Sequence, residues 1–317
     1  MRKKVFIKNP EIFQGEKFLN TSKNYFEGWY FKCNNSEEGI SFIPGINIEE
    51  NSKKSFIQVI TNKESYFVNY NINDFKFKDK PFEIQIGKNA FSKSGMNINI
   101  EDNSKKLVIK GNVRFSNRIN IETSLLNPNI MGPFSYIPFM ECNHAILCMK
   151  NTTNGTININ DKIIDLDNST GYIEKDWGCS FPKRYIWCQG NNFSKKNISF
   201  MLAIADIPFG LFDFRGIICD IIIDKNEYRF ATYNNAKILE YIIKDDTVII
   251  NLKKKNYYLN LKIIYDKGNK LSAPVKGKMS KDIFESISSI IQVTLIKDNK
   301  IIFDDTSKNC GLEIVKN

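Results

Sequence analysis

Short runs of alternating apolar and polar residues follow one another along almost the whole chain. In the first half such runs occupy residues 55–61, 65–72, 82–86, 96–100 and 106–113. Clusters of Asn, Asp, Gly and Ser separate the runs about every ten residues, which is a typical spacing for turns between strands. Alternation with a period of two places one face of a strand on a core. The pattern therefore predicts antiparallel β-structure of the sandwich or barrel kind rather than βαβ units.

The second half repeats this rhythm, and helical periodicity is nearly absent from the chain. Only residues 281–289 are compatible with a short helix, and they fit a strand almost as well. Each half holds roughly seven or eight strands, more than one open sheet usually contains. We therefore predict an all-β fold of two antiparallel β-barrels packed against each other, with domains at 1–165 and 166–317. The strand runs of the second half are 145–149, 155–160, 198–205, 215–224, 227–233, 238–243, 247–252, 257–265, 290–297 and 300–304.

Length and composition are typical of a soluble globular protein. The chain has 317 residues, of which 42% are hydrophobic and 25% are charged, so two domains of ordinary size fit within it. The basic start of the chain reaches Asn9 and Pro10 before an apolar segment can form, which argues against a secretory signal. No apolar run approaches the length of a membrane span. These features predict a cytoplasmic protein.

The formal net charge of +10 raises the question of a nucleic-acid partner. The lysines, however, occur in ones, twos and threes among Asn, Ser and Asp, without interleaved aromatic residues. Such a diffuse distribution argues against nucleic-acid binding. Weak peripheral contact with an anionic membrane surface fits the charge better, because a lipophilic ligand would be collected there.

Cysteine and histidine usage argues against disulfides, metals and common cofactors. The seven cysteines form no CxxC motif, and their odd number does not suit a disulfide framework. With a single histidine, His144, a histidine-based metal centre cannot be assembled. No P-loop, dinucleotide fingerprint or serine nucleophile elbow occurs. We therefore expect reduced thiols, no bound metal and no cofactor.

Residues 171–193 are the segment richest in aromatic and charged side chains. They contain Trp177 and Trp187 together with the acids Glu174 and Asp176. One interpretation is a strand-turn-strand corner whose tryptophans fill the end of a barrel. The other is an aromatic-walled cavity with one or two carboxyl groups facing a ligand. The two interpretations are compatible.

Several motifs in this segment and elsewhere resemble the tocopherol cyclase family. The family pattern reads approximately Tyr-x-Glu-Lys-Asx-Trp-Gly-x-x-Phe-Pro, followed by Trp-x-Gln-x-Asn, and it matches residues 172–182 and 187–191. Further blocks match in order along nearly the whole chain. They are Phe-Glu-Gly-Trp-Tyr-Phe-Lys at 26–32, Ser-Phe-Ile-Pro-Gly-Ile at 41–46, Met-Gly-Pro-Phe at 131–134, Pro-Phe-Met-Glu-Cys-Asn-His at 138–144, Leu-Ser-Ala-Pro-Val-Lys-Gly-Lys-Met at 271–279 and Cys-Gly-Leu-Glu at 310–313.

The resemblance implies a pair of lipocalin-like barrels and a specific kind of chemistry. Tocopherol cyclases close a chromanol ring on a prenylated hydroquinone: an acid protonates the alkene nearest the ring, and the phenol oxygen captures the tertiary cation. Such a reaction needs a carboxylic acid that burial keeps protonated. It also needs aromatic faces that stabilise a cation and a site that excludes water. The implied ligand is a small lipophile, either a prenylated aromatic compound or a polyene.

Five carboxyl groups lie in or near these motifs. If residues 172–177 form a strand, Glu174 and Asp176 share one face, and Trp177 lies on the other. Two acids on one face raise the pKa of one of them. We expect Asp176 to be the proton donor, with Glu174 next. The alternative for each acid is an ion pair with a cation such as Lys32, Lys183 or Arg184. The five acids are Glu27, Glu141, Glu174, Asp176 and Asp206.

The remaining site predictions concern His144 and the residues that contact the ligand. A lone histidine is more often structural than catalytic, although its position in a family-like block makes a catalytic role plausible. Asn143 stands where the family often has an aromatic residue, which would alter the shape or polarity of the pocket. The predicted catalytic residues are Asp176, Glu174, Glu27 and His144; the predicted substrate-binding residues are Trp29, Tyr30, Glu141, Trp177, Trp187, Gln189 and Asn191.

Three functions are compatible with these features. The first is acid-catalysed cyclisation of a prenylated quinol or a related isoprenoid lipid, as the resemblance implies. The second is an isoprenoid hydratase, which uses the same acid and lets water capture the cation. The third is a lipophile-binding carrier without chemistry. No oligomeric state follows from the sequence.

Overall fold

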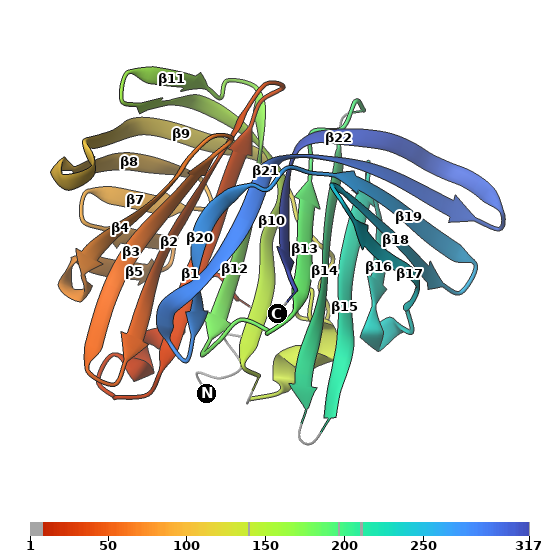
Figure 1. The fold of residues 1–317 in the computed structure, drawn as a ribbon, viewed down its shortest axis with the longest axis horizontal. Helices are drawn as coiled ribbons and strands as arrows, with labels where there is room; N and C mark the ends of the chain where they lie inside the picture. Colours follow the sequence, from red (N-terminus) through yellow and green to blue (C-terminus); the bar gives the residue numbers. More distant parts are fainter. Residues whose placement is uncertain (1–8, 139, 196, 210–211, 317) are drawn as a thin grey trace. The chain divides into compact units, whose positions relative to one another are not determined.

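The structure is a computed structural model that describes residues 9–138, 140–195, 197–209 and 212–316. The basic start of the chain and Phe139 of the 138–144 motif lie outside this part of the chain. Within it, almost every element is a β-strand, and every strand pairing is antiparallel, as Figure 1 shows for two large sheets. The predicted all-β antiparallel fold is confirmed.

The chain divides into two compact units, and the first contains residues Met1–Phe181 and Leu271–Asp282. Its sheet has 12 strands in the order β4-β3-β2-β1-β12-β10-β9-β8-β7-β6-β5, and β11 pairs with β10 outside this path. The strands are β1 (Tyr25–Asn34), β2 (Gly39–Glu49), β3 (Ser52–Thr61), β4 (Ser65–Asn71), β5 (Phe75–Asp79), β6 (Phe82–Ile86), β7 (Asn89–Ser92), β8 (Gly95–Asp102), β9 (Leu107–Ile119), β10 (Cys142–Ile159), β11 (Lys162–Asp165) and β12 (Ser169–Gly178).

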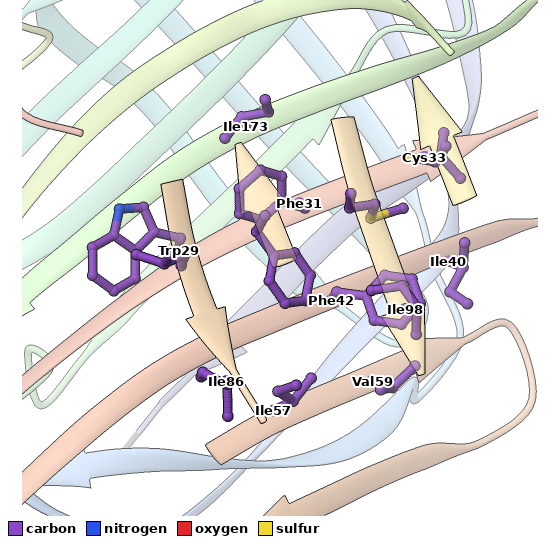
Figure 2. Close-up of a cluster of buried hydrophobic side chains, with 14 of the residues drawn as sticks. Trp29, Phe31, Cys33, Ile40, Phe42, Ile57, Val59, Ile86, Ile98 and Ile173 are labelled. Atoms are coloured by element: carbon purple, nitrogen blue, oxygen red, sulfur yellow. The ribbon is translucent and has the colours of Figure 1, made fainter. Parts of the chain in front are cut away.

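This sheet curls around a single hydrophobic core. Its two edge strands, β4 and β5, are consecutive in the chain and are joined only by the short 3-10 helix η2 (Ile72–Asp74). Every strand of the sheet contributes at least one buried apolar side chain to the core. Trp29 of β1, in the middle of the sheet, stacks on Phe75 of the edge strand β5 with ring centroids 6.3 Å apart. Figure 2 shows Trp29, Phe31, Phe42 and Ile98 converging within this core.

The second unit contains Pro182–Lys270 and Ile283–Asn317. The second sheet has 10 strands in the order β16-β15-β14-β13-β22-β21-β19-β18-β17, with β20 paired to β21. Its edge strands β16 and β17 are again consecutive and are joined by the 3-10 helix η5 (Thr232–Asn234). The strands are β13 (Tyr185–Gly190), β14 (Ile198–Phe209), β15 (Phe212–Ile223), β16 (Asn226–Ala231), β17 (Lys237–Lys244), β18 (Thr247–Lys254), β19 (Tyr257–Ile264), β20 (Asn269–Val275), β21 (Lys278–Lys297) and β22 (Lys300–Val315).

The two sheets share one topology. In each sheet the first four strands form a meander, a 3-10 turn leads to the opposite edge, and the last strand inserts beside the first. Thus β12 pairs with β1, and β22 pairs with β13. Residues 25–29 (Tyr-Phe-Glu-Gly-Trp) and 172–177 (Tyr-Ile-Glu-Lys-Asp-Trp) have a similar order of residues. They are not equivalent positions of the repeated topology, because they lie on β1 and β12, which pair with each other within the first sheet.

Residues 281–289, which were compatible with either a short helix or a strand, lie in the long strand β21. Their burial does not alternate strictly, because Glu285, Ser286 and Ile287 are all buried. The predicted domain boundary at 165/166 lies between β11 and β12 and stays a prediction; the first compact unit runs to Phe181 and also includes Leu271–Asp282. No helix among the described residues is long and apolar enough to cross a membrane. The remaining 3-10 helices are η1 (Gly15–Phe18), η3 (Asn103–Lys105) and η4 (Gly132–Tyr136).

A buried ion pair joins β1 to β12 on the core side of the first sheet. The Lys175 Nζ atom lies 2.5 Å from the Glu27 carboxylate, and both side chains are fully buried. Lys175 also donates to the backbone oxygens of Pro10 and Ile12, and the backbone amides of Gln14 and Gly15 donate to Glu27. The pair therefore fixes the segment that precedes η1 against the sheet.

The ammonium group of this pair lies between two indole rings. The Lys175 Nζ atom is 4.9 Å from the ring centroids of both Trp29 and Trp177. Burial lowers the pKa of Lys175 below its ordinary value, and the negative charge of Glu27 opposes this shift. A buried charge pair of this kind is costly to break, because either partner alone is left as an uncompensated charge.

We predict that Lys175→Met destabilises the protein by about 3–5 kcal/mol, since it leaves the Glu27 carboxylate buried without its cation. The double variant Glu27→Gln/Lys175→Met removes both charges and is expected to recover more than half of that loss. Urea denaturation of wild type, both single variants and the double variant measures the coupling. If the two single-variant effects simply add, the ion pair does not have the stabilising role assigned to it.

Candidate functional site

The candidate site lies on the face of the first sheet that points away from its hydrophobic core. On β12, Ile173 and Lys175 face the core side, so Tyr172, Glu174 and Asp176 face the opposite side. The structure therefore places the carboxylates of Glu174 and Asp176 on one face and Trp177 on the other, as the alternation predicted. The neighbouring strands β1 and β10 complete this face, because β12 is hydrogen-bonded between them.

His144 brings the two carboxylates together. It lies directly across from Asp176 on β10, and its Nδ1 atom is 2.9 Å from Asp176 Oδ1. Its Nε2 atom is 3.5 Å from Glu174 Oε2. One imidazole ring thus bridges two acids from the adjacent strand. We name His144, Glu174 and Asp176 the bridged acid cluster.

Two tyrosines extend the cluster. The Tyr172 hydroxyl donates to Glu174 Oε2 at 2.6 Å, and its ring packs edge-on against Tyr30 with centroids 6.4 Å apart. The Tyr30 hydroxyl in turn accepts a hydrogen bond of 2.9 Å from Ser41 Oγ. A ring contact between Tyr172 and Tyr30 therefore joins the cluster on β12 and β10 to the Ser41–Tyr30 hydrogen bond on β2 and β1.

Burial differs along the cluster. The Glu174 side chain is 6% exposed and that of His144 is 12% exposed, whereas that of Asp176 is 23% exposed. Burial and the charge of Glu174 raise the pKa of Tyr172 well above its ordinary value, so this phenol remains a hydrogen-bond donor. Burial, reinforced by the charge of Asp176, likewise raises the pKa of the Cys142 thiol. Asp176 is thus the member of the cluster most accessible to a ligand.

The arrangement suits proton transfer and is also compatible with a cation. An imidazole between two carboxylates can hold a proton and pass it to either side, because each ring nitrogen faces an acid. The same His144 nitrogen and carboxylate oxygens lie within 4.8 Å of one another, a set that could hold a metal ion. The single histidine led to the expectation of no bound metal, but a set of one imidazole and two carboxylates needs only one histidine. The absence of a bound metal stays a prediction.

Three of the predicted residues lie around the buried ion pair rather than in the cluster. Glu27 pairs with Lys175, not with the expected Lys32, Lys183 or Arg184. Trp29 is fully buried, and its Nε1 atom donates to the Glu11 backbone oxygen at 2.9 Å. Trp177 packs against the core, and its ring contacts the Lys175 ammonium. The predicted aromatic surface therefore belongs mainly to the core on the other face of the sheet.

Other predicted acids have different surroundings. The Glu141 side chain is exposed, and its backbone oxygen accepts hydrogen bonds from Cys179 and Ser180. Asp206 forms ion pairs with Arg184 at 2.6 Å and with Arg215 at 3.0 Å. These cations, with the Arg215 hydrogen bond as the main cause, hold the pKa of Asp206 below its ordinary value. Asp206 therefore forms an ion pair, which was the alternative to a role as the catalytic acid.

Three predicted ligand-binding residues, Trp187, Gln189 and Asn191, lie in the second unit. All three are at most 6% exposed. Gln189 lies on β13 between Met201 of β14 and Gly311 of β22. These residues belong to a different sheet from the bridged acid cluster, and their predicted contact with a ligand stays a prediction.

Sequence reasoning did not select Tyr172 or Lys175 as site residues. Tyr172 precedes Glu174 by two positions, so the same alternation that joined Glu174 and Asp176 places it on their face. The alternation of the strand was therefore sufficient to predict the position of Tyr172. Lys175 pairs with Glu27 across 148 positions of the chain, since β12 lies beside β1, and no local pattern indicates such a pairing.

Comparison with known proteins agrees with the family resemblance. A family model described as tocopherol cyclase-like matches residues 121–315. No curated protein sequence matches the chain. The matched region includes His144, Glu174 and Asp176, whereas the similar blocks at 26–32 and 41–46 lie before it.

Solved structures of similar fold cover nearly the whole chain. Kievitone hydratase from Nectria haematococca aligns with 12% identity and a TM-score of 0.53 over 96% of this chain and 93% of that chain. CghA with Sch210972 aligns with 8% identity and a TM-score of 0.55 over 92% of this chain and 89% of that chain. A putative AttH from Nitrosomonas europaea aligns with 9% identity and a TM-score of 0.50 over 96% of this chain and 97% of that chain. At these identities the likeness shows the fold alone.

The raised pKa of Tyr172 predicts a pH dependence of stability. Unfolding returns the phenol to an ordinary pKa of about 10. The stability that the protonated Tyr172 phenol gives to the folded state is therefore fully present below pH 10, and it is lost as the pH rises toward the folded-state pKa. Above pH 10 the free energy of unfolding of Tyr172→Phe should therefore fall less steeply than that of wild type, by about 1.4 kcal/mol per pH unit.

Urea denaturation between pH 8 and pH 11 measures this difference. Tyr136→Phe, at a ring that is 49% exposed, is the matched control and should follow wild type. Parallel curves for wild type and Tyr172→Phe would show that the Tyr172 hydroxyl is not held in its protonated form by the fold.

Proposed function

This chain belongs to the tocopherol cyclase-like family, and we propose that it is an acid–base enzyme that protonates an alkene of an isoprenoid lipid. Cyclisation of a prenylated quinol is the proposed outcome. The observation that carries the proposal is the bridging of Asp176 and Glu174 by His144 at 2.9 and 3.5 Å. An imidazole held between two acids retains a transferable proton in a largely buried place.

In the proposed reaction, Asp176 is the proton donor. The π electrons of the alkene take the proton from the Asp176 carboxyl group, which leaves a tertiary carbocation and a carboxylate. A phenol oxygen of the same substrate then forms the new C–O bond and releases its proton. That proton returns to the carboxylate through His144, so the reaction is redox-neutral and consumes no second substrate.

His144, Glu174 and Tyr172 have supporting roles in this proposal. His144 shares a hydrogen bond with the Asp176 carboxyl group and returns a proton to Asp176 after each turnover. Glu174 orients the imidazole from its other side, and the hydrogen bond from Tyr172 fixes the Glu174 carboxylate. A carboxylate that orients a histidine in this way selects its tautomer and its direction.

The other predicted residues receive narrower roles. We assign Tyr30 to ligand contact, because its ring adjoins Tyr172 on the same face. We assign Glu27 and Trp29 to the scaffold, since the buried ion pair satisfies Glu27 on the opposite face. Ligand contact by Trp177, Trp187, Gln189, Asn191 and the exposed Glu141 remains proposed from the sequence motifs.

Hydration of the alkene is the second proposed outcome. The Asp176 side chain is 23% exposed, so water can approach the acid more closely than it can approach Glu174. Water would then capture the cation in place of the phenol. The two outcomes are separated by product mass, because cyclisation conserves the mass of the substrate and hydration adds one water.

The test incubates purified protein with geranylgeranyl hydroquinone in detergent micelles made in deuterium oxide. Protonation of the alkene by the enzyme places one deuterium on carbon in the product, which mass spectrometry detects. Asp176→Asn is expected to lower the rate by about 10²–10⁴-fold, the usual contribution of a general acid. Glu37→Gln, at an exposed acid remote in sequence from the cluster, is the control and should match wild type.

Other results would contradict the proposal. Equal deuterium incorporation by wild type and Asp176→Asn would remove Asp176 as the donor. Binding of the hydroquinone without any turnover would favour the lipophile carrier instead. Activity that a chelator abolishes and a divalent metal restores would assign the bridged acid cluster to metal binding rather than to proton transfer.

A further inference from the structure

On the β1 side of the proposed acid, the next two strands of the sheet each have a glycine in the row of Asp176. On β1, Gly28 lies directly across from Asp176, and on β2, Gly45 lies directly across from Gly28. One row of the sheet therefore reads Gly45, Gly28, Asp176 and His144 from β2 to β10. In a sheet, residues in such a row share a face, so both glycines lie on the face of the bridged acid cluster.

The two glycines have different surroundings. A Cβ atom added at Gly45 would lie 2.6 Å from the Phe56 ring, which therefore already occupies that position. A Cβ atom added at Gly28 would meet only two described atoms within 4 Å: Ile43 Cγ2 at 3.6 Å and the Pro44 carbonyl oxygen at 3.9 Å. These are ordinary van der Waals distances. The space above Gly28 is thus open to at least a methyl group.

Apolar side chains border this open space. Phe26 and Tyr30 precede and follow Gly28 by two positions on β1, so they share its face. Phe26 packs edge-on against Phe181 with ring centroids 5.3 Å apart, and Ile43 lies on the β2 side. The Asp176 carboxylate is the polar group across the row. A flat apolar group fits such surroundings better than a charged or strongly hydrated one.

We propose that Gly28 is a specificity-determining residue whose open position admits the reacting trisubstituted alkene of an isoprenoid chain to Asp176. This inference rests on the proposed function and adds the place where the alkene lies. The missing side chain lets a flat carbon–carbon double bond approach the sheet beside the acid. Phe26, Tyr30 and Ile43 contact the methyl and methylene groups around it.

The local geometry makes this inference testable by small substitutions. The backbone at Gly28 does not have a positive φ angle, and no clash follows from adding a Cβ atom. Ala and Val in a strand are as favourable as Gly or more so. Gly28→Ala should therefore fold with a melting temperature equal to or above that of wild type. Gly28→Ala and Gly28→Val fill progressively more of the space that the alkene needs.

The binding probe is geranylgeranyl-1,4-benzoquinone, which has the isoprenoid alkenes but no phenol to close a ring. Its dissociation constant follows from quenching of tryptophan fluorescence. We expect the dissociation constant to rise stepwise from wild type to Gly28→Ala to Gly28→Val, by about tenfold or more for Val, since one methylene in a pocket changes discrimination by about 10–200-fold. Methylbenzoquinone without the chain is the control ligand, and its binding should change much less.

The outcomes distinguish this inference from the proposed function. An unchanged dissociation constant in a folded Gly28→Val variant, or no binding of the isoprenoid quinone to wild type, overturns the alkene position. Weakened binding by Gly28→Val together with full turnover by Asp176→Asn supports the alkene position and removes Asp176 as donor. Weakened binding accompanied by a lower melting temperature in both Gly28 variants would show that the glycine serves the fold, which also overturns the inference.

Discussion

β12 pairs in antiparallel fashion with β1 on one side and β10 on the other. This pairing determines the arrangement of the Glu27–Lys175 ion pair and of the bridged acid cluster. This pairing brings residues from three distant parts of the chain into one row: Gly28, Asp176 and His144. It also sends alternate side chains of β12 to opposite faces. If β12 shifted by one residue, Lys175 would replace Asp176 on the face of the acid cluster. The register of one strand is therefore the constraint on which the proposed chemistry depends.

The two faces of β12 hold charges in different ways. On the core side, the Lys175 ammonium is matched by Glu27, by two backbone oxygens and by two indole rings. On the other side, Glu174 and Asp176 lie 3.5 and 2.9 Å from the two nitrogens of one imidazole. The first arrangement satisfies each charge with several partners, which suits a scaffold. The second places two acids beside one imidazole, which is the arrangement that the proposed acid catalysis needs.

Local patterns predicted much of this structure. Alternation predicted the strands and the shared face of Glu174 and Asp176, and the sequence motifs predicted the family, which the match over residues 121–315 confirms. Local patterns cannot reveal pairings between distant strands. For this reason the Lys175 partner of Glu27 and the meeting of His144 with Asp176 required the structure. The helix considered for residues 281–289 does not form because this segment is part of β21, where Glu285, Ser286 and Ser289 pair with β22.

The central claim is that the proton that Asp176 donates is shared with His144 across their 2.9 Å hydrogen bond. Because His144 is the only histidine in the chain, its imidazole can be observed by nitrogen-15 NMR without any assignment step. The account predicts a slowly exchanging, strongly downfield proton in the hydrogen bond between His144 Nδ1 and Asp176 Oδ1 in wild type at neutral pH, lost in Asp176→Asn and shifted in Glu174→Gln. An imidazole with the spectrum of a free, rapidly exchanging histidine, unchanged by either substitution, would contradict it.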